Sequence, residues 1–508
     1  MKPIFLLIIP RTFDSRDMPL GFMYISAVLK QAGYEVYGLN LPGIQGEAKA
    51  LIETAIIRYR PDVVATTSGA INMPEVREIF SVAKEILPTI KTIAGGALPT
   101  AEPELMLRDV FTDIVVIGEG ELTILELAQA LTDGHSIAAI HGIGYLDNGK
   151  YCQTPPRQPI MDLDSLPFPD LETFNVIDVL DLSHPMDMYL LDIEDNPRPI
   201  QIISSRGCPN SCTFCGHTLP KKIRYRSLDN VFAEIDLRVK ECRPNIIAFC
   251  DEMLTDDKAR LLELCQRIKP YGLHWFTTIR ADIIDEEVAG AMVDSGCFLT
   301  YIGVDSADET VLRSMKKGTT VDRITRTIDI LKKYQHGIQG NLLFGDSAET
   351  ESTAINSLNW WLNNKFFFLF LRVVLPFPGS EVYRKALQAG KIPDKVKFLE
   401  QRCHQVNLTN MPDDQLIEIN RTLGNMADFH KPVGMVTAEY QDTHPIKGRR
   451  FTANLTCGTC GKATVYRNLN PDGITWFRAT NPDYARVNCR KCHMPNYFPL
   501  SVFDNELT

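Results

Sequence analysis

The sequence has no apolar run long enough to cross a membrane. The stretch at residues 366–371 is broken by Arg372 and stopped by Pro376, far short of the roughly 20 residues that a membrane helix needs. The opening stretch MKPIFLLIIPR is similar to a signal peptide, but it ends at Pro10 and Arg11 without a small-residue cleavage site. We therefore expect a cytoplasmic protein with no membrane partner, whose first apolar segment is a buried strand.

Net positive charge is also lacking, which argues against a protein that binds nucleic acid over its whole surface. The 508 residues include 53 Lys and Arg against 63 Asp and Glu, a net charge of −10. The segment after residue 446 is locally basic, with nine basic residues against four acidic ones. No internal repeat or low-complexity tract is present, and a hydrophobic share of 44% predicts a globular protein of several domains.

Cysteine is absent from the first 150 residues, although the chain has 13. In a cytosolic protein, closely spaced cysteines indicate metal ligands rather than disulfides. Seven of them form two tight groups, one of three in the middle of the chain and one of four near its end. The six isolated cysteines are expected to be small buried apolar residues.

The first 140 residues alternate apolar runs with amphipathic helical segments, which is the pattern of a doubly wound α/β domain. Buried strands are expected at 4–9, 35–39, 62–67, 91–94 and 113–117. Apolar residues recur at helical spacing between them, as in Val76, Ile79, Phe80, Ala83 and Leu87. We predict a Rossmann-like domain over residues 1–140.

Small residues follow three of these predicted strands. The loops read Thr66-Thr67-Ser68-Gly69, Gly95-Gly96-Ala97 and Gly118-Glu119-Gly120-Glu121. Ligands of such sheets bind beyond the carboxyl ends of the strands, so these loops are candidates for contact with a large flat or phosphorylated ligand. The alternative is that the glycines only close tight turns.

A proline-rich linker at 141–195 precedes a second series of strands. Between residues 196 and 390, six apolar runs recur at roughly the 30-residue spacing of a βαβ repeat, too few for an eight-stranded barrel. We predict a partial (βα)6 barrel of the TIM type in this α/β protein. A helical connector at 391–450 and a small zinc-ribbon-like module at 451–508 complete the predicted domains.

The most specific motif, SSRGCPNSCTFCGH, lies directly after the first predicted barrel strand. Its C-x3-C-x2-C spacing lets Cys208, Cys212 and Cys215 bind three irons of a cubane 4Fe-4S cluster, which leaves the fourth iron open for chemistry. Such folds build their active sites at the carboxyl ends of barrel strands. A structural zinc site with His217 as the fourth ligand is the alternative.

This motif resembles that of the radical S-adenosylmethionine (SAM) superfamily, including Phe214 before the last cysteine. The resemblance implies that the open iron binds SAM and that one-electron reduction cleaves SAM to a 5'-deoxyadenosyl radical. It continues in Gly303-Val304-Asp305-Ser306 and in Pro376-Phe377-Pro378-Gly379-Ser380. It implies SAM contacts at Phe214, Asp251, Arg280, Asp305 and Ser306. The alternative for each charged residue is an ion-paired strand end.

The N-terminal domain resembles the cobalamin-binding subgroup of this superfamily. The resemblance rests on Met18-Pro19-Leu20-Gly21, on the glycine-rich loops and on the linker sequence LDSLPFP from residue 163. It implies cobalamin contacts at Pro19, Leu20, Gly21, Thr67, Ser68, Gly95, Gly96, Gly118, Glu119 and Gly120. The D-x-H-x-x-G motif of other corrinoid proteins is absent, so we expect a detached base and no histidine from that motif on cobalt. The alternative is a domain that has lost the cofactor.

The four-cysteine module contains two C-x2-C pairs. Cys457, Cys460, Cys489 and Cys492 predict a tetrahedral zinc site in a ribbon with short strands at 464–466 and 474–478. An auxiliary iron–sulfur cluster is the alternative. We expect metal loss to unfold only this module, whose positive charge could serve an anionic substrate, a peptide or RNA.

The resemblance implies a cobalamin-dependent radical SAM methyltransferase that acts on an unactivated carbon through a 5'-deoxyadenosyl radical and methylcobalamin. A rearrangement or cyclisation without methyl transfer and an RNA-modifying reaction are the enzymatic alternatives. A vestigial barrel in a non-enzymatic zinc-ribbon protein is opposed by the intact cysteine triplet. The expected partners are a small-molecule or peptide substrate and a reductant such as flavodoxin or ferredoxin. The sequence identifies neither a catalytic residue nor the substrate.

Overall fold

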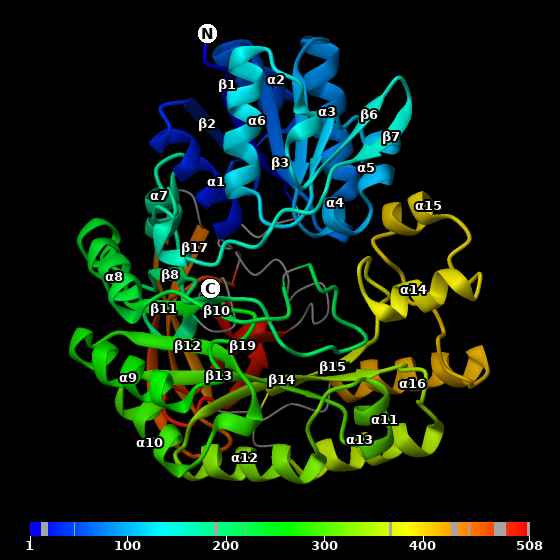
Figure 1. The fold of residues 1–508 in the computed structure, drawn as a ribbon. Coiled ribbons are helices and arrows are strands. Elements are labelled where there is room, and N and C mark those ends of the chain that lie inside the picture. Colours follow the sequence, from blue (N-terminus) through cyan, green and yellow to red (C-terminus); the bar gives the residue numbers. More distant parts are fainter. Residues whose placement is uncertain are drawn as a thin grey trace. The chain divides into compact units, whose positions relative to one another are not determined.

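The computed structural model divides the chain into two compact units (Figure 1). It describes residues 1–11, 19–44, 46–186, 191–218, 220–364, 368–427, 435–444, 448–471 and 484–504. Unit 1 comprises Met1–Val179, Arg206–Asn230 and Leu375–Leu408, and unit 2 comprises Leu180–Ser205, Val231–Val374 and Thr409–Thr508. Among the described helices, none is both long and apolar enough to span a bilayer.

Unit 1 is built on a seven-stranded sheet whose first five strands are parallel. Its order is β2 (Glu35–Asn40), β1 (Ile4–Ile9), β3 (Val63–Thr67), β4 (Lys91–Gly95), β5 (Ile114–Val116), β6 (Ile143–Asp147) and β7 (Lys150–Gln153). β6 and β7 are added antiparallel. The order β2-β1-β3-β4-β5 is that of a doubly wound fold, so the predicted Rossmann-like domain is confirmed. β1 is buried as predicted.

Amphipathic helices of unit 1 bury their apolar stripes in its core. They are α1 (Leu20–Gln31), α2 (Ala48–Tyr59), α3 (Met73–Ile86), α4 (Ala97–Ala101), α5 (Pro103–Asp109) and α6 (Glu121–Asp133), and α7 (Val176–Asp181) leads into unit 2. The distant helices α14 (Glu381–Gln388) and α15 (Lys395–Glu400) join them. Their Tyr383 and Phe398 share one buried cluster with Val76 and Phe80. The segment 375–408, which the sequence suggested was barrel and connector, therefore packs in unit 1.

Unit 2 contains a six-stranded, parallel sheet. Its order is β15 (Phe368–Val373), β14 (Gly337–Phe344), β13 (Cys297–Asp305), β12 (His274–Ile279), β11 (Ile246–Phe249) and β8 (Pro199–Ile202). Its helices are α8 (Leu228–Cys242), which starts in unit 1, α9 (Lys258–Ile268), α10 (Glu286–Asp294), α11 (Glu309–Ser314), α12 (Val321–Lys333), α13 (Glu351–Asn363) and α16 (Asp413–Ala427). Trp275 and Ile279 are buried on one face of β12, whereas Phe276 and Thr278 on the other face are half-buried. This alternation fits the predicted partial barrel, with one closed face and one open face.

The C-terminal module is rich in β-structure, as predicted. β16 (Val436–His444), β17 (Gly448–Thr456) and β18 (Ala463–Leu469) form an antiparallel sheet, and β19 (Tyr484–Asn488) pairs with β20 (Pro495–Pro499). Phe451, Tyr466 and Phe498 belong to its core. The predicted strand at 464–466 is part of β18, whereas the one at 474–478 lies outside the described residues.

Candidate functional site

The carboxyl edge of the unit 1 sheet carries the predicted cobalamin contacts. The loops after β3 and β4 are joined there, because the Ser68 N–H donates to the Gly95 carbonyl at 2.9 Å. Gly96 has a φ of 100°, and a Cβ on it would lie 2.8 Å from Thr67 Oγ1. Glycine is therefore needed at position 96, because a side chain would separate the two loops.

A cavity of about 300 Å³ opens at the same edge. Gly118 and Glu119, which follow β5, line it together with Thr100 and Gly142. Gly118 has a φ of 81° and no atom within 4 Å of where a Cβ would be, so a ligand can approach its backbone. Among the described residues, no histidine lines the cavity. The open backbone at Gly118 leaves room for a ligand, and cobalamin without a histidine ligand stays a prediction.

The other predicted cobalamin contacts differ in their surroundings. Pro19 precedes α1, and Gly21 is exposed with open space around it. Leu20 is buried, and a Cβ on Gly120 would meet the Ile25 side chain at 3.1 Å. Gly21 can therefore reach a ligand, whereas Leu20 and Gly120 contact the protein. Met18, part of the resemblance, lies outside the described residues.

The three-cysteine motif lies on one loop between the short paired strands β9 (Ser205–Arg206) and β10 (Arg224–Tyr225). Cys212 is buried, Cys208 is half-buried and Cys215 is exposed. The three thiols thus range from the interior of the loop to its surface, and the exposed one leaves room for a ligand beside it.

Close backbone packing shapes this loop. A Cβ on Gly207, whose φ is 98°, would lie 2.5 Å from the Lys222 carbonyl oxygen. The Val382 N–H donates to the Thr213 carbonyl at 3.0 Å, so the residues after the predicted 376–380 motif pack on the loop. His217 Nε2 lies 3.1 Å from the Cys212 carbonyl oxygen. This contact holds the imidazole at the backbone and argues against the alternative zinc site.

The base of the loop contains a buried ion network that the sequence did not predict. Arg206 contacts Glu119 at 3.1 Å and Glu121 at 2.7 Å, and Arg224 contacts Glu119 at 2.7 Å. Burial raises the pKa of Glu119, but the hydrogen bonds from Arg224 and the Ile160 N–H and the charge of Arg206 outweigh it and lower the pKa overall. The Glu119 carboxylate, predicted to contact cobalamin, is therefore bound to arginine. The only sequence signal was an arginine at each end of the cysteine loop.

Asp251, predicted to contact SAM, is buried at the end of β11. Its carboxylate accepts the Ser204 and Ser205 N–H groups, the first at 2.8 Å, and the Ser205 hydroxyl at 2.9 Å. Burial raises the pKa of Asp251 to about 7 despite these bonds. In this structure, Asp251 fixes the backbone after β8.

The remaining barrel residues predicted to contact SAM also have protein partners. Arg280 Nε donates to Asp282 at 2.9 Å. Asp305, with a φ of 59°, is paired with Lys317. Ser306 Oγ lies 3.3 Å from the Ser357 hydroxyl. These contacts favour ion-paired or hydrogen-bonded strand ends, and the SAM contacts, including half-buried Phe214 of unit 1, stay predictions.

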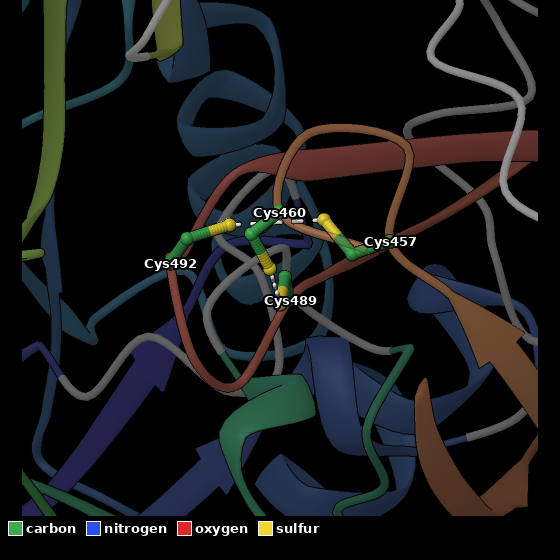
Figure 2. A group of neighbouring side chains, drawn as sticks. All are labelled: Cys457, Cys460, Cys489 and Cys492. Carbon is green, nitrogen blue, oxygen red and sulfur yellow. Dashed lines mark hydrogen bonds between the residues drawn. The ribbon is translucent and has the colours of Figure 1, made fainter. Parts of the chain in front are cut away.

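The four cysteines of the C-terminal module converge (Figure 2). All four Sγ atoms lie within 4.8 Å of one another, and the pairs Cys457–Cys492 and Cys460–Cys489 are 3.7 Å apart. The Thr459 N–H donates to Cys457 Sγ at 3.4 Å, and the Lys491 N–H donates to Cys489 Sγ at 3.4 Å. The β17–β18 and β19–β20 turns thus present two matching knuckles, which could hold a single metal ion.

The second knuckle packs against the amino ends of barrel strands. His493 has a φ of 57°, at the position that Gly461 takes in the first knuckle. Its ring centroid lies 6.1 Å from that of Phe298 in β13, and a Cβ on Gly337, the first residue of β14, would lie 2.9 Å from His493 Cβ. Burial lowers the pKa of His493 to about 4, so the ring is neutral.

Acidic residues of the linker before β8 bind the same module. Asp192 accepts the Asn488 N–H at 2.5 Å, and Asp195 pairs with Arg490 at 2.7 Å and with Arg467 at 3.3 Å. The module and barrel therefore share one packed unit, and the unfolding of the module alone on metal loss stays a prediction. Arg467 and Arg490 are also already paired, which weakens the case for RNA as their partner.

Comparisons with known proteins agree with this division of the chain. The B12 binding domain family matches residues 8–128, and the Radical SAM superfamily matches residues 202–358. An uncharacterised methyltransferase of Pyrococcus horikoshii is 29% identical over 388 residues, covering 75% of this chain and 80% of its own. The cytidylyl-2-hydroxyethylphosphonate methyltransferase of Streptomyces wedmorensis is 26% identical over 444 residues, covering 78% and 82%.

Solved structures of similar fold include a methyltransferase. The radical SAM methyltransferase TsrM from Kitasatospora setae, with cobalamin and a [4Fe-4S] cluster bound, matches with a TM-score of 0.63 and 18% identity, covering 77% of this chain and 76% of that one. The two domain matches, the curated relatives and this fold agree with the cysteine loop and the glycine-rich sheet edge. The chain therefore combines a B12 binding domain with a Radical SAM domain, and its curated relatives include methyltransferases.

Proposed function

We propose that the protein is a cobalamin-dependent radical SAM methyltransferase that methylates an unactivated carbon. One observation carries this proposal: within unit 1, the C-x3-C-x2-C loop is bonded to the loop that lines the cavity at the sheet edge. An iron–sulfur site and a corrinoid cavity joined in this way suit a reaction that needs both cofactors. The methyltransferase names of the two curated relatives support the same reaction class.

Residues of the cysteine loop and of the sheet edge would bind the two cofactors. Cys208, Cys212 and Cys215 would bind three irons of a cluster and leave the fourth open for SAM, and a one-electron donor such as flavodoxin or ferredoxin would supply the electron. When bound, cobalamin supplies the methyl group and cluster-bound SAM supplies the 5'-deoxyadenosyl radical. The open space at Gly118 and at the exposed Gly21 would leave room for the corrin. The substrate is a small molecule or a peptide.

The test measures products that need no known substrate. The full chain is reconstituted anaerobically and incubated with SAM and a strong reductant, with and without added cobalamin. We expect S-adenosylhomocysteine that depends on cobalamin, because methyl transfer consumes SAM in this way. 5'-Deoxyadenosine without S-adenosylhomocysteine would favour rearrangement or cyclisation instead.

The four-cysteine site would hold zinc in a structural role. A tetrahedral zinc with Zn–S bonds of about 2.3 Å separates its sulfurs by about 3.8 Å, close to the 3.7 Å of the two thiol pairs. In a cubane, each thiolate binds a different iron and the four sulfurs lie farther apart. Because all four Sγ atoms lie within 4.8 Å of one another, their distances favour one metal ion over an auxiliary cluster.

The position of the module suits a structural role for this zinc. His493 packs at the amino ends of β13 and β14, whereas barrel chemistry takes place at the carboxyl ends. The module would close the end of the barrel opposite the reaction. Metal analysis of a chain with Cys208, Cys212 and Cys215 all changed to Ala decides between the metals. One zinc per chain supports the structural role, and about four irons per chain would indicate an auxiliary cluster.

A further inference from the structure

Four charged side chains hold the base of the cysteine loop. Arg206 ends β9 just before the loop, and Arg224 begins β10 just after it. Glu119 lies in the turn between β5 and α6, and Glu121 is the first residue of α6. The exposed fraction of each of these side chains is 9% or less. The network therefore lies almost wholly out of contact with water.

Glu119 bridges the two arginines. Its Oε1 lies 3.1 Å from Arg206 Nη1, and its Oε2 lies 2.7 Å from Arg224 Nη1. Arg206 Nη2 lies 2.7 Å from Glu121 Oε1, so the Arg206 guanidinium is held by two carboxylates. The ring of Tyr24, 4.9 Å away, lies under the same guanidinium. Two positive and two negative charges thus form a balanced, directional network.

Stability alone does not account for this network. Replacing a buried ion network with apolar side chains of similar volume is often neutral or stabilising. An arginine fork binding carboxylates does, however, fix direction as well as distance. Here the Arg206 fork and a single contact from Arg224 Nη1 connect Glu119, which lines the cavity, to both ends of the loop that carries Cys208. The network joins the places where the two cofactors are expected.

We infer that Glu119, Glu121, Arg206 and Arg224 are positioning residues, which set the distance between the iron–sulfur cluster and the cobalamin cavity. The inference rests on the proposed function, since it requires both cofactors. The four side chains act through the backbone of the two loops. A displacement of about 1 Å is enough to lower a catalytic rate strongly, so such a clamp would be important for methyl transfer.

The variants Arg206→Lys and Glu121→Gln test this clamp. Lysine keeps the positive charge but loses the fork, and glutamine keeps the shape but loses the charge. Glu126→Gln is the matched control, because Glu126 also lies on α6 but pairs with Arg157 instead of the loop arginines.

The readout is the magnetic coupling between cob(II)alamin and the reduced cluster, measured by pulsed EPR on the anaerobically reconstituted full chain. This coupling falls with the inverse cube of the distance between the two spins. We expect one narrow coupling in the wild type and in Glu126→Gln. Arg206→Lys and Glu121→Gln should shift the mean distance by about 1 Å or broaden its distribution, with iron and cobalamin contents unchanged.

The same coupling in both loop-clamp variants as in the wild type would overturn the inference while leaving the proposed function intact. A wild type that binds no cluster or no cobalamin would overturn both. If Arg206→Lys loses iron, Glu121→Gln decides, because its substitution is not in the cysteine loop.

Discussion

Removal of the Asp192 side chain should loosen the C-terminal module from the barrel. Asp192 is 3% exposed, and its carboxylate accepts two hydrogen bonds from Asn488, from the backbone N–H at 2.5 Å and from Nδ2 at 3.3 Å. Asn488 immediately precedes Cys489, one of the four proposed metal ligands. Asp192→Ala would therefore remove the acceptor of a half-buried backbone donor next to Cys489.

The magnitude follows from these two bonds. Leaving a buried donor unsatisfied costs about 1–3 kcal/mol, and the longer second bond adds less than the first. We expect the opening of the module to become easier by about 2–4 kcal/mol, which corresponds to a roughly 30-fold to 1,000-fold larger open population. Metal release that requires this opening should accelerate by the same factor.

The assay follows zinc release from the anaerobically purified full chain to a coloured chelator. Arg467→Ala is the control, because the Arg467 side chain is 60% exposed and lies 3.3 Å from Asp195. Such exposed pairs contribute at most about 1 kcal/mol, so its release rate should rise no more than about fivefold. Equal rates in Asp192→Ala and Arg467→Ala would refute the reasoning.

Two further predictions concern protonation and the cysteine loop. Burial raises the pKa of Asp192, Asp251 and Glu349 to about 7, against about 4 in an unfolded chain. The folded chain then binds more protons than the unfolded chain, so the free energy of unfolding falls as the pH rises from about 4 to about 7. In denaturant titrations, Glu349→Gln should flatten the dependence of this free energy on pH by up to about 1.4 kcal/mol per pH unit. An unchanged pH dependence would contradict the raised pKa of Glu349. Gly207→Ala should lower the iron content of the reconstituted chain, because the added Cβ would lie 2.5 Å from a backbone oxygen. Gly134→Ala is the control and should keep its iron, because Gly134 also has a positive φ but no atom lies within 4 Å of its added Cβ.

Local sequence patterns predicted most of the fold. Alternating apolar runs located the strands of both sheets within a few residues, since burial of a parallel strand requires a continuous apolar run. The spacing of Cys208, Cys212 and Cys215 indicated the cluster loop, and the paired C-x2-C motifs indicated the metal site of the module. Each strand and the three-cysteine motif lie within one short segment, and the two C-x2-C pairs lie in two short segments whose identical spacing links them.

Contacts between distant segments could not be predicted in this way. Glu119 meets Arg206 across 87 residues, and neither residue type specifies a partner at that distance. Phe398 in the core of unit 1 and His493 beside Phe298 likewise contact residues that are far away in the sequence. Glu119 and Asp251 were linked to ligands by resemblance, but their carboxylates bind protein groups because the fold buries them.

The most direct test of the account is the formation of 5'-deoxyadenosine by the anaerobically reconstituted full chain, compared with the variant in which Cys208, Cys212 and Cys215 are all alanine. With SAM and a strong reductant, the account predicts 5'-deoxyadenosine from the wild type and none from the triple variant, because only the three thiolates hold the cluster that reduces SAM. The triple variant should keep the metal of the four-cysteine site. 5'-Deoxyadenosine formed by the triple variant at the wild-type rate would contradict the central claim.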